Sequence, residues 1–175
     1  LKNETLETLK ARRSCRDFKP EQIRDEELDA ILEAGTYAPT GMGKQSPIMI
    51  AVQNKDDIAE LERINAEIFG KPDSNPFYGA PTVIVVLADA DRPTAVYDGS
   101  LVMGNLLNAA ASVGVDSCWI HRAKETFERE DGRTLLKKWG IEGNYIGIGN
   151  CVLGYAASSP SPALPRKTGY ITKVK

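Results

Sequence analysis

The sequence contains little cysteine and histidine, and this scarcity excludes several kinds of site. Its 175 residues include three cysteines and one histidine, and no two cysteines form a CxxC pair. An odd number of widely spaced cysteines argues against a disulfide framework. A single histidine, His121, leaves no multi-histidine zinc site. We therefore expect neither disulfide bonds nor a metal centre.

An excess of one charge and a long apolar run are also absent. The chain carries 22 Lys and Arg against 24 Asp and Glu, a formal charge of −2, which argues against a nucleic-acid-binding protein. The longest apolar run, residues 83–88, has the length of a strand, far short of the roughly 20 residues of a membrane-spanning helix. The N-terminal residues are polar and lack a signal-peptide core. We expect a cytoplasmic protein without membrane or nucleic-acid partners.

Hydrophobic periodicity predicts helices and strands that are intermixed along the chain. Helices are expected at 6–12, 25–35, 56–68, 94–113 and 125–139, and strands at 48–52, 82–87, 117–120 and 145–155. Asp25 is expected to cap the second helix at its start and Gly35 at its end. The length predicts one domain, residues 1–175. The order of elements fits a three-layer α+β or α/β domain.

Three segments have unusual composition. Residues 70–81 are rich in glycine and proline and are expected to form a loop or lid. The helix 94–113 is rich in small residues, which let another backbone approach closely, so it is expected to lie centrally. The tail 156–175 is proline-rich and then basic, and cannot bury much against its own domain. It is either disordered or laid across a partner subunit.

Two basic clusters are candidate anion sites. Arg12, Arg13 and Arg16 lie with Ser14 at the end of the first helix, and arginine forks match phosphate oxygens. The alternative is a solvated basic helix end that is favoured by the helix dipole. The second cluster is Arg166 and Lys167, which is either a solvated tail or the other half of one anion site.

The usual nucleotide and nucleophile motifs are absent. The stretch 41–44 fails as a P-loop because residue 45 is Gln, and 147–149 lacks the spacing of a dinucleotide fingerprint. Cys15 lies among arginines that would lower its pKa, so it is either reactive or packed beneath a bound anion. This combination suits a protein whose chemistry is carried by a cofactor.

Four segments, in the same order, resemble the nitroreductase family of FMN-dependent oxidoreductases. Residues 12–18 resemble its R-R-S-x-R-x-F opening, and residues 38–45 its A-P-S-G-x-N-x-Q loop. Residues 98–120 resemble its long central helix followed by a G-x-x-S-C-W-I strand, and residues 165–167 its C-terminal P-R-K. The resemblance covers nearly the whole chain and implies an α+β fold of three α/β/α layers. Its central sheet is mixed and mostly antiparallel.

The resemblance also implies a homodimer with two FMN molecules at the interface and C-terminal arms, about 156–175, swapped between subunits. Such a dimer would be obligate, with an interface above ~2,000 Å². The cofactor-binding residues carried over are Arg12, Arg13, Ser14, Arg16, Pro39, Thr40, Gly41, Gln45, His121, Arg122, Arg166 and Lys167. Of these, Arg12 with Arg166 or Lys167 would hold the phosphate. His121 and Arg122 would present a backbone N–H to flavin N5. Pro39, Thr40 and Gly41 would come from the other subunit.

The expected reaction is ping-pong reduction of nitroaromatics, quinones or similar electron-poor acceptors by NAD(P)H through flavin N5, with no catalytic side chain. Met42, Phe77 and Tyr78 are the expected pocket wall. Gly43 departs from the family pattern, in which many members carry Asn, so one side-chain contact to the cofactor is lost or replaced. The alternatives are a non-catalytic FMN-binding dimer, another flavin reaction such as reductive dehalogenation, and a protein that binds no flavin.

Overall fold

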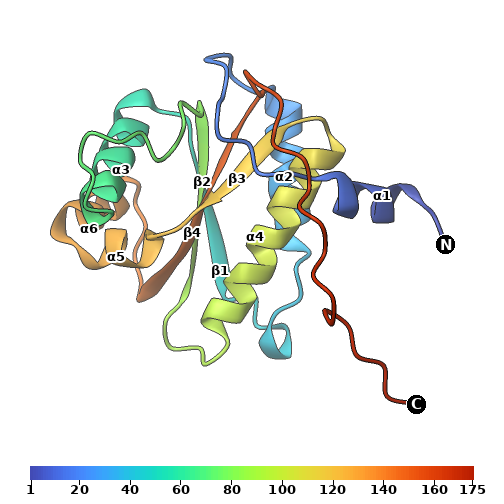
Figure 1. The fold of residues 1–175 in the computed structure, drawn as a ribbon. Coiled ribbons are helices and arrows are strands. Elements are labelled where there is room, and N and C mark those ends of the chain that lie inside the picture. Colours follow the sequence, from blue (N-terminus) through green and yellow to red (C-terminus); the bar gives the residue numbers. More distant parts are fainter.

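The computed structural model describes residues 1–175, and a four-stranded sheet lies at its centre (Figure 1). In spatial order the strands are β1 (Pro47–Val52), β2 (Thr82–Asp89), β4 (Tyr145–Gly154) and β3 (Asp116–Ile120). Every neighbouring pair is antiparallel. The expected predominance of antiparallel pairing is confirmed, and the one parallel pairing is an isolated bridge between Ser14 and Ser117.

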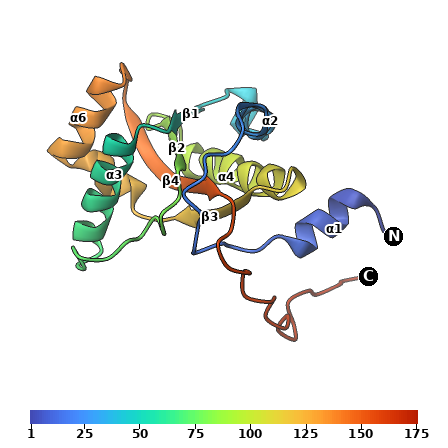
Figure 2. The ribbon, with the colours of Figure 1, turned by 90° about the horizontal axis from the view of Figure 1, so that it is seen from above.

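Helices cover both faces of the sheet, as the three-layer expectation requires. Figures 1 and 2 show α2 (Asp25–Thr36) and α4 (Ala95–Ser112) on one face. The other face carries α3 (Lys55–Ile68), α5 (Ala123–Glu128) and α6 (Glu130–Lys138). Each interlayer space holds a core cluster of 16 buried residues. The α+β fold class is therefore confirmed.

The central strand β2 explains how these two clusters are separated. Its seven residues from Thr82 to Ala88 are fully buried. Side chains alternate across the sheet, so Val83, Val85 and Leu87 belong to one cluster, whereas Ile84 and Val86 belong to the other. An uninterrupted β-branched run is typical of a strand that is covered on both faces.

The helix expected at 125–139 is wrong, because the chain forms two helices there. Between α5 and α6, Arg129 is extended, with φ −81° and ψ 157°. The two helices then pack so closely that a Cβ on Gly132 would lie 1.9 Å from the carbonyl oxygen of Thr126. Glycine at this position lets α6 fold back on the end of α5.

The capping residues expected for α2 are also wrong. The N-cap is Arg24, whose backbone N–H donates to the Glu27 side chain at 2.9 Å, and Asp25 is the first helical residue. Gly35 lies inside the helix rather than after it. A Cβ there would lie 2.6 Å from Met49 Sδ and 2.9 Å from Leu106 Cδ2. Gly35 therefore serves the close packing of α2 rather than a left-handed turn.

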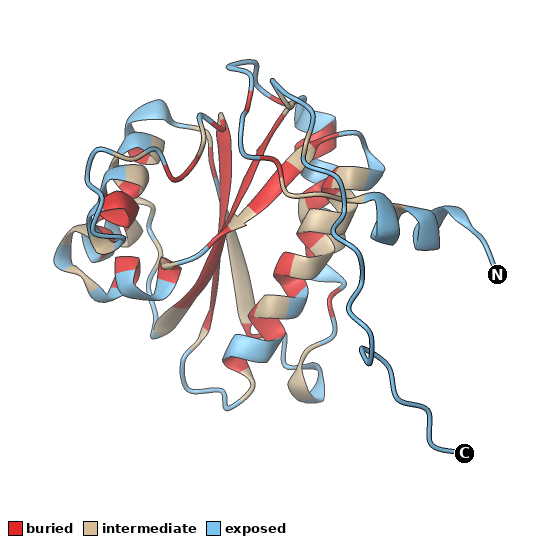
Figure 3. Cartoon of the chain, in the orientation of Figure 1, coloured by how far each residue is buried: buried red, intermediate tan, exposed pale blue.

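Both ends of the chain extend away from the packed layers. Figure 3 shows them almost entirely in the colour of exposed residues. The helix α1 (Glu4–Ala11) buries no residue. The tail begins by pairing with residues 17–19: Ala157 N–H donates to the Asp17 carbonyl and Lys19 N–H to the Tyr155 carbonyl, both at 2.8 Å. Residues 161–175 are exposed and contain no helix or strand. The segment 70–81 is a loop, as expected.

Candidate functional site

A cavity of about 750 Å³ opens where α1 ends. It is lined by α1, by the turn that joins α4 to β3, and by residues 160–163 of the tail. Arg12 faces this cavity, and its Nη1 atom is buried without a hydrogen-bond partner. A buried donor that lacks an acceptor costs about 1–3 kcal/mol, more when it is charged. The cavity therefore lies beside a guanidinium with one unsatisfied donor, and Glu4, Glu7 and Asp116 line it as well.

The other residues of the first basic cluster have different surroundings. Arg13 Nη1 donates to the carbonyls of Lys10 at 2.8 Å and Arg12 at 2.6 Å, so it caps the end of α1. Arg16 is exposed and has no ion-pair partner within the chain. The interpretation as a basic helix end thus applies to Arg13. The guanidiniums of Arg12 and Arg16 have no carboxylate partner and remain candidates for binding an anion.

The chain after Arg13 is fixed to the edge of the sheet. Ser14 forms the bridge to Ser117, and Cys15 N–H donates to the Ser117 carbonyl at 2.9 Å. The thiol of Cys15 is buried, with Sγ 3.2 Å from the Asp17 carbonyl oxygen. Burial raises the pKa of this thiol. The structure favours the packed alternative over a reactive Cys15, because burial and the nearby Asp116 carboxylate raise its pKa.

The second basic cluster is not brought to Arg12 within one chain. Arg166 and Lys167 are exposed and lie outside the lining of the cavity. The Arg166 guanidinium turns back to the Leu164 carbonyl, with Nε at 3.1 Å. Lys167 Nζ lies 5.2 Å from the centroid of the Tyr170 ring.

The glycine loop is anchored by a buried carboxylate that sequence reasoning missed. Asp98, 3% exposed, accepts hydrogen bonds from Gly41 N–H at 2.9 Å, Ser46 Oγ at 3.0 Å and Thr94 Oγ1 at 2.9 Å. Burial by itself would raise the pKa of Asp98, but these hydrogen bonds outweigh it and hold the pKa below its ordinary value. The available signal was an acidic residue beside Gly99, on the small-residue face of α4.

The loop itself projects into solvent beyond that anchor. Pro39, Met42 and Gln45 are exposed, whereas Thr40 is half-buried and its hydroxyl accepts from Gln45 N–H at 3.0 Å. Met42 and Gln45 adopt left-handed φ values of 55° and 50°. Side chains of these types are strained there.

One chain keeps the glycine loop and the arginine cavity apart. The loop contacts Thr94 and Asp98 at the start of α4, whereas Ala111 and the turn after α4 line the cavity. The 18 residues of α4 separate these places by about 27 Å at the usual rise of a helix.

The turn after β3 holds the third group of predicted residues. His121 is exposed, and Arg122 has a left-handed φ of 74°. No hydrogen bond within the chain engages the N–H of either residue. Asn65 of α3, which sequence reasoning also missed, contacts both residues by hydrogen bonds.

The three residues expected to line a substrate pocket do not share one environment. Phe77 is 1% exposed and packs in the core beneath α3, so burial places it in the interior rather than on a pocket wall. Tyr78 is half-buried with φ 58°, and its carbonyl accepts from Phe18 N–H at 3.2 Å. Met42 is 91% exposed.

Metal-binding clusters and membrane-spanning helices are both absent from the structure. No group of His, Cys, Asp or Glu residues could hold a metal ion. None of the helices has both the length and the apolar character needed to cross a bilayer.

Comparison with known proteins identifies the family. The sequence model described as "Nitroreductase family" matches residues 9–155, so the chain belongs to the nitroreductase family. A protein of Archaeoglobus fulgidus, provisionally named NADH dehydrogenase/NAD(P)H nitroreductase, is 30% identical over 87% of this chain and 85% of its own length.

Two solved structures extend the similarity to the fold. A nitroreductase with bound FMN from Bacteroides fragilis is 34% identical, with a TM-score of 0.92 over 99% of this chain and 100% of that one. A nitroreductase with bound FMN from Desulfitobacterium hafniense is 32% identical, with a TM-score of 0.89 over the full length of both chains. The expected family and fold are confirmed.

Proposed function

We propose that this protein is an FMN-dependent oxidoreductase that uses NAD(P)H to reduce electron-poor acceptors such as nitroaromatics or quinones. The observation that carries the proposal is the buried, unpaired Nη1 of Arg12 at a cavity, within the opening family motif. The proposal is also supported by the FMN that both similar nitroreductase structures contain. NAD(P)H is part of the name of the Archaeoglobus relative.

The residues present fit the two ends of FMN. The cavity at Arg12 provides a charged donor without a partner, which suits a phosphate. Ser14, two residues further along the chain, is fixed through its bridge to Ser117. Arg16 is an exposed cation with no carboxylate partner, so it is free to stabilise negative charge at the pyrimidine edge of a reduced flavin.

When bound, FMN would supply the two-electron transfer between a reduced nicotinamide and an acceptor. The chain would contribute position and electrostatics. The backbone at His121 and Arg122 has N–H groups without partners in the chain and would donate to flavin N5. The glycine loop, held by Asp98, would present Pro39 and Gly41 to the ring.

A homodimer is part of the proposal, because one chain separates the glycine loop from Arg12 by the length of α4. A second copy would bring its own loop to the first copy's cavity. Apolar side chains are exposed where such a copy could pack, namely Leu6, Leu9, Val96, Tyr97 and Leu101. The exposed tail would cross to the partner and carry Arg166 and Lys167 to its Arg12.

An absorbance spectrum recorded after gel filtration with FMN tests the cofactor and the dimer together. We expect flavin absorbance to co-elute with a dimer. Oxidation of NADH or NADPH by that complex should then require an added quinone or nitroaromatic. Bound FMN without turnover on any acceptor would indicate a non-catalytic flavin-binding dimer, and a protein that stays colourless would refute the proposal.

A further inference from the structure

We propose that Asn65 of α3 is a positioning residue that fixes the peptide between His121 and Arg122, and so sets the direction of the Arg122 N–H. The inference rests on the proposed function, in which this backbone meets the flavin. Asn65 does not touch the cofactor in this scheme and acts only through the residues that it holds.

The carboxamide of Asn65 contacts two consecutive residues. Its Nδ2 donates to the His121 carbonyl at 2.8 Å, and its Oδ1 accepts from Arg122 Nε at 3.0 Å. Asn65 is fully buried, so water does not compete with either bond on the side of the carboxamide. A buried amide that satisfies both of its ends fixes its partners strongly.

The direction of the Arg122 N–H follows from peptide geometry. The carbonyl of His121 and the N–H of Arg122 belong to one planar trans peptide, so they point in opposite directions. Because Asn65 holds the carbonyl toward α3, the N–H must point away from α3. That N–H has no partner within the chain.

The left-handed backbone of Arg122 needs such support. A non-glycine residue at φ 74° is strained and persists where its surroundings determine it. Besides the bond to Asn65, the guanidinium lies 4.4 Å from the ring centroid of Phe69, the residue that caps the end of α3. The Arg122 carbonyl accepts from Thr126 N–H at 2.9 Å and Thr126 Oγ1 at 2.8 Å. The residue is therefore held from both sides.

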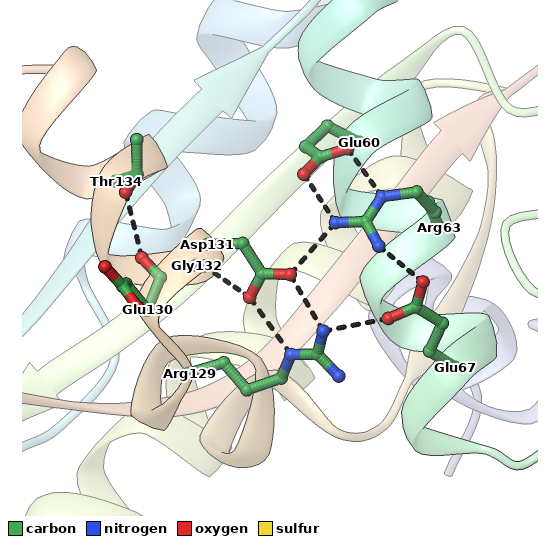
Figure 4. A network of polar contacts seen from close by, with 8 residues as sticks. All are labelled: Glu60, Arg63, Glu67, Arg129, Glu130, Asp131, Gly132 and Thr134. Atoms are coloured by element: carbon green, nitrogen blue, oxygen red, sulfur yellow. Dashed lines mark hydrogen bonds and ion pairs between the residues drawn. The ribbon is translucent and has the colours of Figure 1, made fainter.

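The helix that carries Asn65 is itself fixed to its neighbours. Figure 4 shows Arg63 and Glu67 of α3 joined to Arg129 and Asp131, with Arg63–Asp131 at 2.9 Å and Arg129–Glu67 at 2.8 Å. A single exposed ion pair contributes little, but these pairs form a network. The hydrogen bonds that fix Arg122 therefore come from a helix that is itself held by ion pairs, and not from a loop.

Substitutions at Asn65 separate its two bonds. Asn65→Asp keeps an acceptor for Arg122 Nε but has no donor for the His121 carbonyl. Asn65→Leu has a similar size and removes both bonds. Phe69→Leu removes only the ring that stacks on the Arg122 guanidinium. Because Phe69 is 48% exposed, this variant tests the support of Arg122 if the Asn65 variants do not fold.

The control is Asn54→Ala on the same helix. Asn54 is the N-cap of α3, and its Oδ1 accepts from Asp57 N–H at 3.0 Å. Losing an N-cap destabilises a helix, but this one does not contact His121 or Arg122. The control therefore reports what mere destabilisation of α3 does.

The first measurement uses the protein without FMN. Backbone ¹⁵N NMR order parameters at residues 121–123 should fall in Asn65→Leu and Asn65→Asp, and less in Phe69→Leu, but not in Asn54→Ala. Unchanged order in the Asn65 variants would overturn the inference, whatever the protein binds.

The second measurement uses the FMN complex. An N–H aimed at N5 favours oxidised flavin, whose N5 accepts, so misdirecting it should raise the midpoint potential. We expect the ratio of affinities for reduced and oxidised FMN to change about tenfold in the Asn65 variants, which is about 30 mV for a two-electron couple. Asn54→Ala should leave the potential unchanged.

A wild-type protein that takes up no FMN would refute the proposed function, while the order parameters would still decide the role of Asn65. A bound flavin whose potential is the same in all variants would overturn the inference alone.

Discussion

Replacing Arg12 by methionine should affect the cofactor-free and FMN-bound proteins in opposite directions. Methionine keeps much of the length of the side chain but removes the guanidinium. In the protein without FMN, that guanidinium has a buried Nη1 with no partner. In the proposed complex, the same group would donate to the phosphate. The substitution therefore removes a destabilising unsatisfied donor from the cofactor-free protein and removes a hydrogen bond to the phosphate from the FMN complex.

The two magnitudes follow from the burial of this donor. An unsatisfied buried donor costs about 1–3 kcal/mol, so the free energy of unfolding without FMN should stay the same or increase by up to that amount. A charge-assisted hydrogen bond contributes about 1.5–3 kcal/mol. Its loss should raise the dissociation constant of FMN about 12- to 140-fold.

Two titrations check this prediction. Urea unfolding in the absence of FMN gives the stability, and quenching of FMN fluorescence gives the affinity. Arg92→Met is the matched control, because Arg92 is exposed and its one ion pair, to Asp89, is 3.5 Å long. An Arg12→Met protein that binds FMN within threefold of the wild type would refute the phosphate assignment. A loss of more than about 1 kcal/mol in the cofactor-free protein would refute the argument from burial.

Three further predictions concern the fold and the tail. Gly147→Ala should lower the free energy of unfolding by about 1–3 kcal/mol or more, measured by urea denaturation, because the new Cβ would lie 2.2 Å from the Ala123 carbonyl oxygen; an unchanged midpoint would contradict this packing. Hydrogen bonds from Arg24 and then Tyr155 lower the pKa of Glu27 from 4.5 to about 2, so its contribution to stability is present above pH 4.5 and is lost as the pH falls through about 2. Glu27→Gln should therefore flatten the acid limb of stability against pH in thermal melts, and an unaltered limb would count against it. Deleting residues 160–175 should release FMN and weaken the dimer in gel filtration, while a truncated protein that stays dimeric, yellow and fully active would disprove the swapped arm.

The sequence predicted those parts of the fold that depend on local pattern. The mostly β-branched run at 82–87 indicated a buried strand, and β2 is fully buried from Thr82 to Ala88. The break at Arg129 escaped prediction because no proline marks it, and Gly132, which lets α6 pack against the end of α5, lies three residues further along. Gly35 was misassigned because a glycine at a helix end serves either a left-handed turn or close packing, and only the fold distinguishes them.

The site was predictable where it coincides with contiguous motifs, and not where it depends on distant contacts. Arg12 was singled out by its neighbours in sequence, and the structure leaves it with an orphaned donor. Asp98 and Asn65 were missed because they act on Gly41 and His121, which lie 57 and 56 residues away. A polar residue within an apolar helix face indicates that its side chain has a hydrogen-bond partner, but the sequence does not show which residue that partner is.

The two sides of the sheet differ in what one chain completes. On the side of α3, α5 and α6, the backbone at residues 121–122 is already fixed by buried hydrogen bonds and an ion-pair network (Figure 4). On the other side, α1 buries nothing, the tail is exposed, and Arg12 lacks a partner. In the proposed dimer, the flavin ring would contact a surface that a single chain already forms. The phosphate would bind at a site that needs residues from both copies. Any ligand that binds the assembled state preferentially stabilises that state, so FMN binding and dimerisation would strengthen each other through the phosphate side.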